Sequence, residues 1–114
     1  MTDCLFCKII QGDIPAKIVH QDDHVIAFDD INPQAPLHQL VVPRKHLSTL
    51  NEVPTEDNAL IGHMLQTAKQ LAAAKGLAED GYRVVMNCNA GAGQTVFHIH
   101  LHVLGGRQML WPPG

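Results

Sequence analysis

Residues 97–103 alternate strictly between apolar residues and histidine, in the order Phe-His-Ile-His-Leu-His-Val. Successive side chains of a β-strand point to opposite faces, so this period of two predicts a strand, which we place over residues 96–104. The apolar side chains would cover a core on one face, while His98, His100 and His102 share the other. Neighbouring imidazoles would stand roughly 6 to 7 Å apart, close enough to act on successive atoms of one small molecule.

The rest of the chain predicts further strands and one long helix. Apolar runs bounded by turn residues predict strands over residues 17–20, 24–28, 38–42 and 82–87. The hydroxyl of Thr55 is placed to cap a helix whose apolar residues repeat with a 3.6-residue period over 60–72 and which ends at 75–76. These elements predict an α+β fold, a single domain over residues 1–114 in which one main helix covers an antiparallel sheet of about five strands.

Composition narrows the class of protein. The 114 residues are 46% hydrophobic and 17% charged, far from the composition of disordered chains. A formal charge of -3 excludes the broad cationic surface of a basic nucleic-acid binder, and no apolar run is long enough for a membrane helix. Three cysteines, an odd number, fit a reducing compartment, so we expect a cytoplasmic protein with neither nucleic acid nor membrane as a partner.

The three histidines admit three interpretations. An ordinary polar strand face explains two histidines more readily than three in strict alternation. His-x-His spacing can place two imidazoles on one zinc ion, but no acidic residue lies between the histidines, so a metal-dependent hydrolase would need ligands from elsewhere. In the third interpretation a neutral imidazole attacks phosphorus while a neighbouring imidazolium protonates the departing group.

The loop before the histidines favours the nucleophilic interpretation. Residues 87–95 read Asn-Cys-Asn-Ala-Gly-Ala-Gly-Gln-Thr. Two glycines let backbone amides turn inward around an anion, and Asn87, Gln94 and Thr95 add neutral hydrogen-bonding groups. Such a loop alone is usually only a turn, but beside three histidines on one face it resembles a phosphate cradle.

Residues 98–104 match the His-apolar-His-apolar-His-apolar-apolar signature of the histidine triad (HIT) family, which the chain resembles. The resemblance covers nearly the whole chain, and the segments at 14–17, 33–36, 93–95 and 105–114 are similar to the Hint branch, the purine nucleoside phosphoramidases. The ending Trp-Pro-Pro-Gly is specific to that branch. The resemblance implies a HIT-like fold and a homodimer in which two sheets join into one continuous sheet.

The resemblance also assigns roles to residues by position. It implies that His100 is the nucleophile that forms a nucleotidyl-histidine, and that His102 contacts the phosphate and assists the leaving group. His98 and His38 would orient the row of histidines at 98, 100 and 102. The matching nucleotide-binding positions are Asn87, Gly93, Gln94 and Thr95 for phosphate and leaving group, Asp30 and Ile31 for ribose, and Phe6, Phe28 and Leu40 for the base. Thr95 stands where serine is more common and keeps the hydroxyl donor, so leaving-group preference can shift.

Cys4 and Cys7 have the spacing of a zinc knuckle, but the chain has no second C-x-x-C pair. Some related triad proteins bind structural zinc through such a pair and the residues that match His46 and His98. A structural zinc and a pair of buried thiols are therefore both open, and no cofactor is required for catalysis. The remaining histidines are expected at the surface or at a sheet edge: His20, His24 and His63.

Together these features predict hydrolysis of the phosphorus–nitrogen bond in adenosine or guanosine 5′-phosphoramidates, with purine nucleoside monophosphates and phosphoramidates as the ligands. A dinucleoside polyphosphate hydrolase or nucleotidyl transferase of the same superfamily would use the same histidine with another leaving group, and the tail at Trp111 argues against it. A nucleotide-binding regulatory protein with incidental hydrolysis is the alternative from another class.

Overall fold

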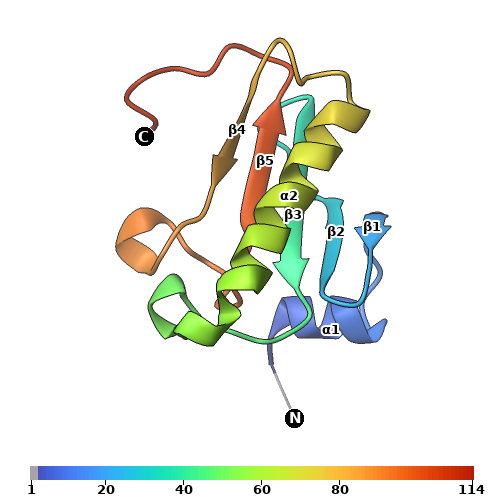
Figure 1. The fold of residues 1–114 in the computed structure, drawn as a ribbon, viewed down its shortest axis with the longest axis vertical. Coiled ribbons are helices and arrows are strands. Elements are labelled where there is room, and N and C mark those ends of the chain that lie inside the picture. Colours follow the sequence, from blue (N-terminus) through green and yellow to red (C-terminus); the bar gives the residue numbers. More distant parts are fainter. Residues whose placement is uncertain (1–2) are drawn as a thin grey trace.

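The computed structural model describes residues 3–114 and is built on a five-stranded antiparallel sheet (Figure 1). The spatial order of the strands is β1-β2-β3-β5-β4. Their bounds are β1 (Ile18–Gln21), β2 (Val25–Asp29), β3 (Leu37–Pro43), β4 (Tyr82–Val85) and β5 (Leu101–Gly105). One long helix, α2 (Asn58–Ala74), crosses one face of the sheet, so the predicted α+β architecture is confirmed.

The register between β3 and β5 brings two histidines together. Leu40 lies opposite His102, and His38 lies opposite Leu104. Because side chains two residues apart share a face, His38 and His102 are diagonal neighbours on the same face of the sheet. The pairing therefore places a fourth histidine, distant in sequence, beside the triad.

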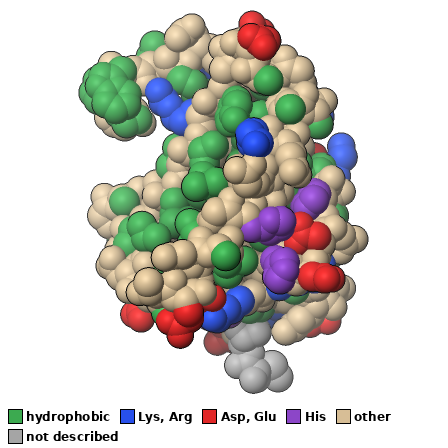
Figure 2. Space-filling model, in the orientation of Figure 1, with side chains coloured by type: hydrophobic (Ala, Val, Ile, Leu, Met, Phe, Trp, Pro, Cys, Tyr) green, Lys and Arg blue, Asp and Glu red, His purple; other side chains and the backbone are tan. Residues whose placement is uncertain are grey.

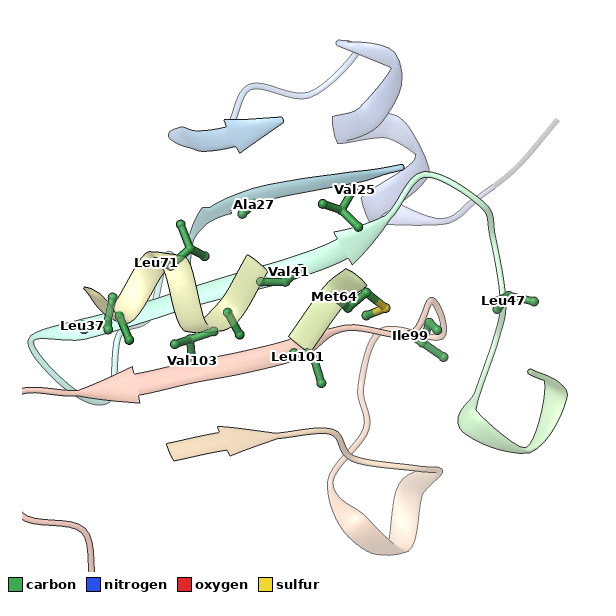
Figure 3. Packing of buried hydrophobic residues seen from close by; sticks show 12 residues of the cluster. Val25, Ala27, Leu37, Val41, Leu47, Met64, Leu71, Ile99, Leu101 and Val103 are labelled. Atoms are coloured by element: carbon green, nitrogen blue, oxygen red, sulfur yellow. The ribbon is translucent and has the colours of Figure 1, made fainter. Parts of the chain in front are cut away.

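Helix α2 buries an apolar stripe against one face of the sheet. Its Met64, Ala68, Leu71 and Ala72 pack in a core that includes strand residues such as Val103 (Figure 3). This spacing of three and four residues is the stripe that the sequence predicts. The helix is followed by Lys75 and Gly76, and Gly76 has a φ of +74°.

The start of this helix differs from the prediction, and the expected cap at Thr55 is wrong. Residues Thr55–Asp57 form a 3-10 turn (η2), and α2 begins at Asn58 with Asp57 as N-cap and no side-chain capping hydrogen bond. The extra turn separates the Thr55 hydroxyl from the first α-helical amides. The Asp57 carboxylate instead accepts a hydrogen bond from Lys45 Nζ at 2.6 Å.

The opposite face of the sheet is covered by a short helix, α1 (Leu5–Gln11), which is not among the predicted elements. Phe6 and Ile9 of this helix pack with Ile26, Phe28, Leu40 and Val42 from β2 and β3. The Sγ atom of Cys4 accepts a hydrogen bond from the Cys7 amide at 3.4 Å and caps the first turn. Gly12, with φ of +85°, ends the helix.

The segment before β5 is less regular than predicted. The strand begins at Leu101 instead of 96, and β4 ends at Val85 instead of 87, because the chain between them bends through a 3-10 turn, η3 (Ala90–Ala92). The Ile99 amide bonds to the Leu47 carbonyl at 2.8 Å, so the approach to β5 is held by the chain that follows β3. Ile99, Leu101 and Val103 are buried as expected, but Phe97 is 44% exposed.

Another 3-10 turn, η1 (Leu50–Glu52), joins β3 to the region before α2. Within residues 3–114, none of the helices combines the length and the apolar character needed to cross a membrane.

Candidate active site

A pocket of about 420 Å³ opens between α1, the ends of the central strands and the loop at 87–96. The structure brings ten of the sequence-predicted site residues to its wall: Phe6, Phe28, Asp30, Ile31, Leu40, Asn87, Gly93, Thr95, His100 and His102. His38, Gln94 and His98 lie outside the wall. Each makes a hydrogen bond to a wall residue, namely His102, Val96 and His100 respectively.

His100 is buried at the pocket, and its ring orientation is set by its own backbone. Nδ1 of His100 lies 2.7 Å from the carbonyl oxygen of His98. A carbonyl can only accept, so Nδ1 carries the proton and Nε2 carries the lone pair. Burial lowers the pKa of His100 below its ordinary value, although the His98 carbonyl and the charge of Asp30 act in the opposite direction. The ring of Phe6 packs edge-on against it at a centroid distance of 5.0 Å.

The ring of His102 is oriented by a hydrogen bond from another side chain, that of His38. The backbone amide of Gln34 donates to Nδ1 of His38 at 3.0 Å, so a neutral His38 carries its proton on Nε2. That Nε2 lies 2.9 Å from Nδ1 of His102, which must then accept, and the His102 proton is left on Nε2. Burial and the neighbouring His100 and His38 lower the pKa of His102 to about 4. The ring centroids of His100 and His102 lie 5.1 Å apart. The hydrogen bonds leave a lone pair on Nε2 of His100 and a proton on Nε2 of His102.

Asp30 lies at the mouth of the pocket, where the loop leaves β2. Its Oδ1 accepts a hydrogen bond from the Asn32 amide at 2.8 Å, which fixes the carboxylate in a turn. Its Oδ2 lies 3.3 Å from Nε2 of His38. The neighbouring Ile31 side chain is 98% exposed, so it forms the outer rim of the pocket.

The Gln94 side chain stabilises the loop of residues 87–96 and is not part of the pocket wall. Its side chain is 4% exposed. Oε1 accepts from the Asn89 amide at 2.7 Å, and Nε2 donates to the carbonyls of Ser48 at 2.8 Å and Val96 at 3.1 Å. Gly93 beside it has a φ of +93°, a conformation that glycine adopts without strain. These contacts hold Gly93 and Thr95 at the pocket.

His98 turns away from the pocket toward the N-terminal segment. Its Nε2 donates to the Pro43 carbonyl at 2.7 Å, so the Nδ1 lone pair points the other way. Burial lowers the pKa of His98 to about 4, which keeps it neutral. Nδ1 lies 3.3 Å from Cys4 Sγ, 3.6 Å from Cys7 Sγ and 3.1 Å from His46 Nδ1.

These four side chains fit a metal ion by their chemistry and spacing. The donor atoms of Cys4, Cys7, His46 and His98 all lie within 4.8 Å of one another. Zinc bonds of about 2.0 Å to nitrogen and 2.3 Å to sulfur give tetrahedron edges of about 3.3 to 3.7 Å. The measured separations, including 3.4 Å between Cys7 Sγ and His46 Nδ1, are close to these edges. A Cys2His2 set suits structural zinc.

A second group of metal-binding side chains lies at the pocket itself. Donor atoms of Asp30, His38 and His102 also lie within 4.8 Å of one another. However, the Gln34 amide occupies Nδ1 of His38, and neutral His38 therefore has a proton, not a lone pair, on the Nε2 that faces this group. The arrangement suits hydrogen bonding better than metal-dependent hydrolysis.

The other histidines lie at the edge of the sheet and on α2, away from the pocket. Figure 2 shows histidine side chains gathered among acidic ones on this face. Nε2 of His20 and Nε2 of His63 lie 2.9 and 2.8 Å from the same oxygen, Oδ2 of Asp22. Burial opposes ionisation of Asp22, but hydrogen bonds from these rings and from the amides of His24 and Val25 hold its pKa well below the ordinary value.

Some residues of the site were missed by the sequence analysis. The pocket wall also includes Ile9, Ile14 and Val96, and Gln34 sets the orientation of His38. The apolar spacing of residues 5–10 is the signal that could have revealed α1 and part of this wall. For Gln34 the signal is weak, because a backbone amide acts and the side-chain type does not matter.

Comparison with known proteins shows the family to which the chain belongs. The HIT domain profile matches residues 11–109. A HIT-like protein of Synechocystis sp. is 54% identical over 112 residues, which are 98% of this chain and 97% of that protein. The crystal structure of a HIT family hydrolase from Legionella pneumophila has a TM-score of 0.97 and 58% identity, covering 98% of this chain and 100% of that one. That of a histidine triad nucleotide-binding protein from Candida albicans has a TM-score of 0.81 and 33% identity, covering 89% and 73%. The chain therefore belongs to the HIT domain family.

Proposed function

We propose that the protein hydrolyses the phosphorus–nitrogen bond of adenosine or guanosine 5′-phosphoramidates. The observation that carries this proposal is the orientation of His100, whose Nδ1 is held by the His98 carbonyl at 2.7 Å while the ring lines the pocket. Nε2 of His100, which keeps a free lone pair, is therefore the nucleophilic atom. Burial lowers the pKa of His100, so the ring is neutral and reactive at neutral pH.

The reaction proceeds in two displacements. Nε2 of His100 bonds to phosphorus, the phosphorus–nitrogen bond breaks, and nitrogen leaves with the electron pair. A water molecule gives the departing nitrogen its proton and is left as hydroxide. His102 is neutral, because burial lowers its pKa to about 4, so it is not the imidazolium acid expected from the sequence, and its Nε2–H hydrogen-bonds the phosphate instead. The hydroxide then attacks phosphorus and His100 leaves as a neutral imidazole, so the two steps together consume one water.

The pocket offers separate groups to each part of a nucleotide. The carboxylate of Asp30 can accept hydrogen bonds from both ribose hydroxyls. Phe6, Phe28 and Leu40 present apolar surface to the purine. Asn87, Gly93 and Thr95, held in place by the buried Gln94, supply neutral donors for the phosphate.

Two relatives support this direction. The Candida albicans protein is a histidine triad nucleotide-binding protein, and the Legionella pneumophila protein is a HIT family hydrolase. The first supports nucleotide binding here, and the second supports hydrolysis. Choice of the phosphorus–nitrogen bond rests on the resemblance of the C-terminal segment to the Hint branch, and a phosphate-anhydride substrate would use the same attack by His100.

We also propose that the protein is a homodimer joined at the β4 edge of the sheet. Within residues 3–114, β4 is an edge strand that pairs with β5 on one side and with no strand on the other. Leu110 and Trp111 are 73% and 83% exposed, and Figure 2 shows apolar side chains projecting at this end of the molecule. Arg83 of β4 donates to the Leu110 carbonyl at 2.9 Å and holds this segment beside the edge. A continuous sheet across two copies would cover these apolar groups.

The third proposal is a structural zinc held by Cys4, Cys7, His46 and His98. The ion would tie α1 to the residue whose carbonyl orients His100. Zinc there would stabilise the fold and hold His98 in place, and it would contribute no group to the reaction.

Single-turnover mass spectrometry with adenosine 5′-phosphoramidate tests the main proposal. We expect a transient adduct of adenylate mass on His100 and release of adenosine monophosphate and ammonia. Parallel reactions with a dinucleoside polyphosphate measure the alternative leaving group. Turnover without an adduct on any histidine would contradict the proposed chemistry. Much faster turnover of the polyphosphate would reassign the substrate.

A further inference from the structure

The segment that follows β5 is tied to the loop that precedes β3. Nε of Arg107 donates to the carbonyl oxygen of Gln34 at 2.9 Å. One residue earlier, a Cβ atom on Gly106 would come within 2.9 Å of Cβ of Pro36, and Gly106 has a φ of +92°. Glycine is required by both the close approach and the backbone conformation, so the C-terminal segment is seated on this loop.

Gln34 is held from outside by its carbonyl and contacts the site through its amide. The backbone N–H of Gln34 donates to Nδ1 of His38 at 3.0 Å. The Gln34 side chain bonds back to the Asn32 carbonyl at 3.0 Å and keeps the loop closed. Arg107 and His38 therefore contact opposite polar groups of one loop residue.

The hydrogen bonds of this loop decide which nitrogen of each ring carries a proton. While the Gln34 amide donates to His38, the neutral ring must donate from Nε2, and His102 must accept at Nδ1. If Gln34 moves away, Nδ1 of His38 loses its donor, and only the Asp30 carboxylate, 3.3 Å from Nε2, still favours a proton there, so His38 can also populate the tautomer with a lone pair on Nε2. His102 would then donate from Nδ1 and present a lone pair, not a proton, toward an anionic phosphate.

We infer that Arg107 is a positioning residue that, through Gln34 and His38, keeps the Nε2 proton of His102 directed at the phosphate. The use of this proton in turnover rests on the proposed function, but the tautomer of His102 does not. Arg107 itself is exposed and is not part of the pocket wall. Its effect should therefore fall on the rate of the chemical step more than on nucleotide binding.

The test uses Arg107→Ala in the full chain. We expect roughly a tenfold lower kcat with little change in KM, which is the size of effect expected from weakening one hydrogen bond to a charged group. Without substrate, nitrogen-15 shifts of the imidazole rings should show His102 protonated on Nε2 in the wild type and a mixture of tautomers in the variant. Arg107→Lys keeps a cationic donor and should restore part of both signals.

Arg44→Ala is the matched control, because Nε of Arg44 also donates to a backbone carbonyl, that of Asp22, at 2.7 Å. This variant loses the same kind of contact in a loop that does not touch the site, so kcat and the His102 tautomer should stay unchanged. Unaltered His102 shifts in Arg107→Ala overturn the inference, whatever happens to the rate. A higher KM at constant kcat also overturns it. If Arg107→Ala does not fold, the Arg107→Lys shifts decide, since full wild-type shifts with reduced kcat would exclude this route.

Discussion

The carbonyl oxygen of His98 lies 2.7 Å from Nδ1 of His100, two residues along the same chain. This contact orients the candidate nucleophile although residues 98–100 precede the regular strand β5. The orientation therefore depends on a local backbone contact and on burial more than on the alternation of a regular strand.

His100→Ala should abolish turnover of adenosine 5′-phosphoramidate, with a fall in kcat of about 100-fold or more, because the atom that attacks phosphorus is removed. Binding of adenosine monophosphate, measured by calorimetry, should persist because the donors at Gly93 and Thr95 and the apolar wall remain. His24→Ala is the control, since His24 is exposed and lies outside the pocket. Near-normal turnover in His100→Ala would reject the assignment.

Acidification should reduce kcat/KM only well below pH 6.5. Burial lowers the pKa of His100, and burial with the nearby His100 and His38 lowers the pKa of His102 to about 4. Each ring works in its neutral form, so activity is retained above these values and lost as the pH falls through them. We expect a profile that is flat around pH 7 and declines toward pH 4. A decline centred near 6.5, the value of an ordinary histidine, would show that the two rings are not desolvated.

Gln94→Ala should destabilise the fold by about 2 kcal/mol in urea unfolding, because it leaves the Asn89 amide and two carbonyls without their partner. The loop would also loosen around Gly93, and kcat should fall. Thr95→Ser provides the comparison, since it keeps the hydroxyl in the same loop and should leave stability within about 0.5 kcal/mol. Equal stability of Gln94→Ala and wild type would contradict the bracing role.

Protein purified without chelator should contain one zinc per chain by mass spectrometry of metals. Cys4→Ser and Cys7→Ser should each lose the ion and lower the thermal midpoint, because α1 is then tied less firmly to His98. Cys88→Ser, the third cysteine, should retain zinc. Zinc-free wild-type protein with reduced thiols would remove this proposal and leave the reaction scheme intact.

Much of this fold was predictable because its signals are local. The apolar stripe of α2 and the runs that became β2 and β3 carry their periods within a few residues, and the predicted elements overlap the observed ones. The first and last residues of the strands were less predictable. β5 begins at Leu101 because the Ile99 amide bonds to Leu47, more than fifty residues away, and no local pattern encodes that contact.

The candidate site shows the same division. The alternation of histidines indicated which residues could meet one ligand, and His100 and His102 do line the pocket. Gln94 was expected at the phosphate, yet its amide is buried among backbone groups, because a polar side chain in a tight loop can serve the loop itself. The contribution of α1 was missed because a seven-residue helix is stabilised by packing more than by its own sequence.

The wall of the pocket is assembled from both ends of the chain, with Phe6 from α1 and His102 from β5. Neither side exists as a binding surface until the sheet has brought them together. A nucleotide bound between them would therefore bind only the folded chain and stabilise it. At a nucleotide concentration a hundred times its dissociation constant, the free energy of unfolding should rise by about 2.7 kcal/mol. Saturated protein should thus resist proteolysis along its whole length, the N-terminal helix included.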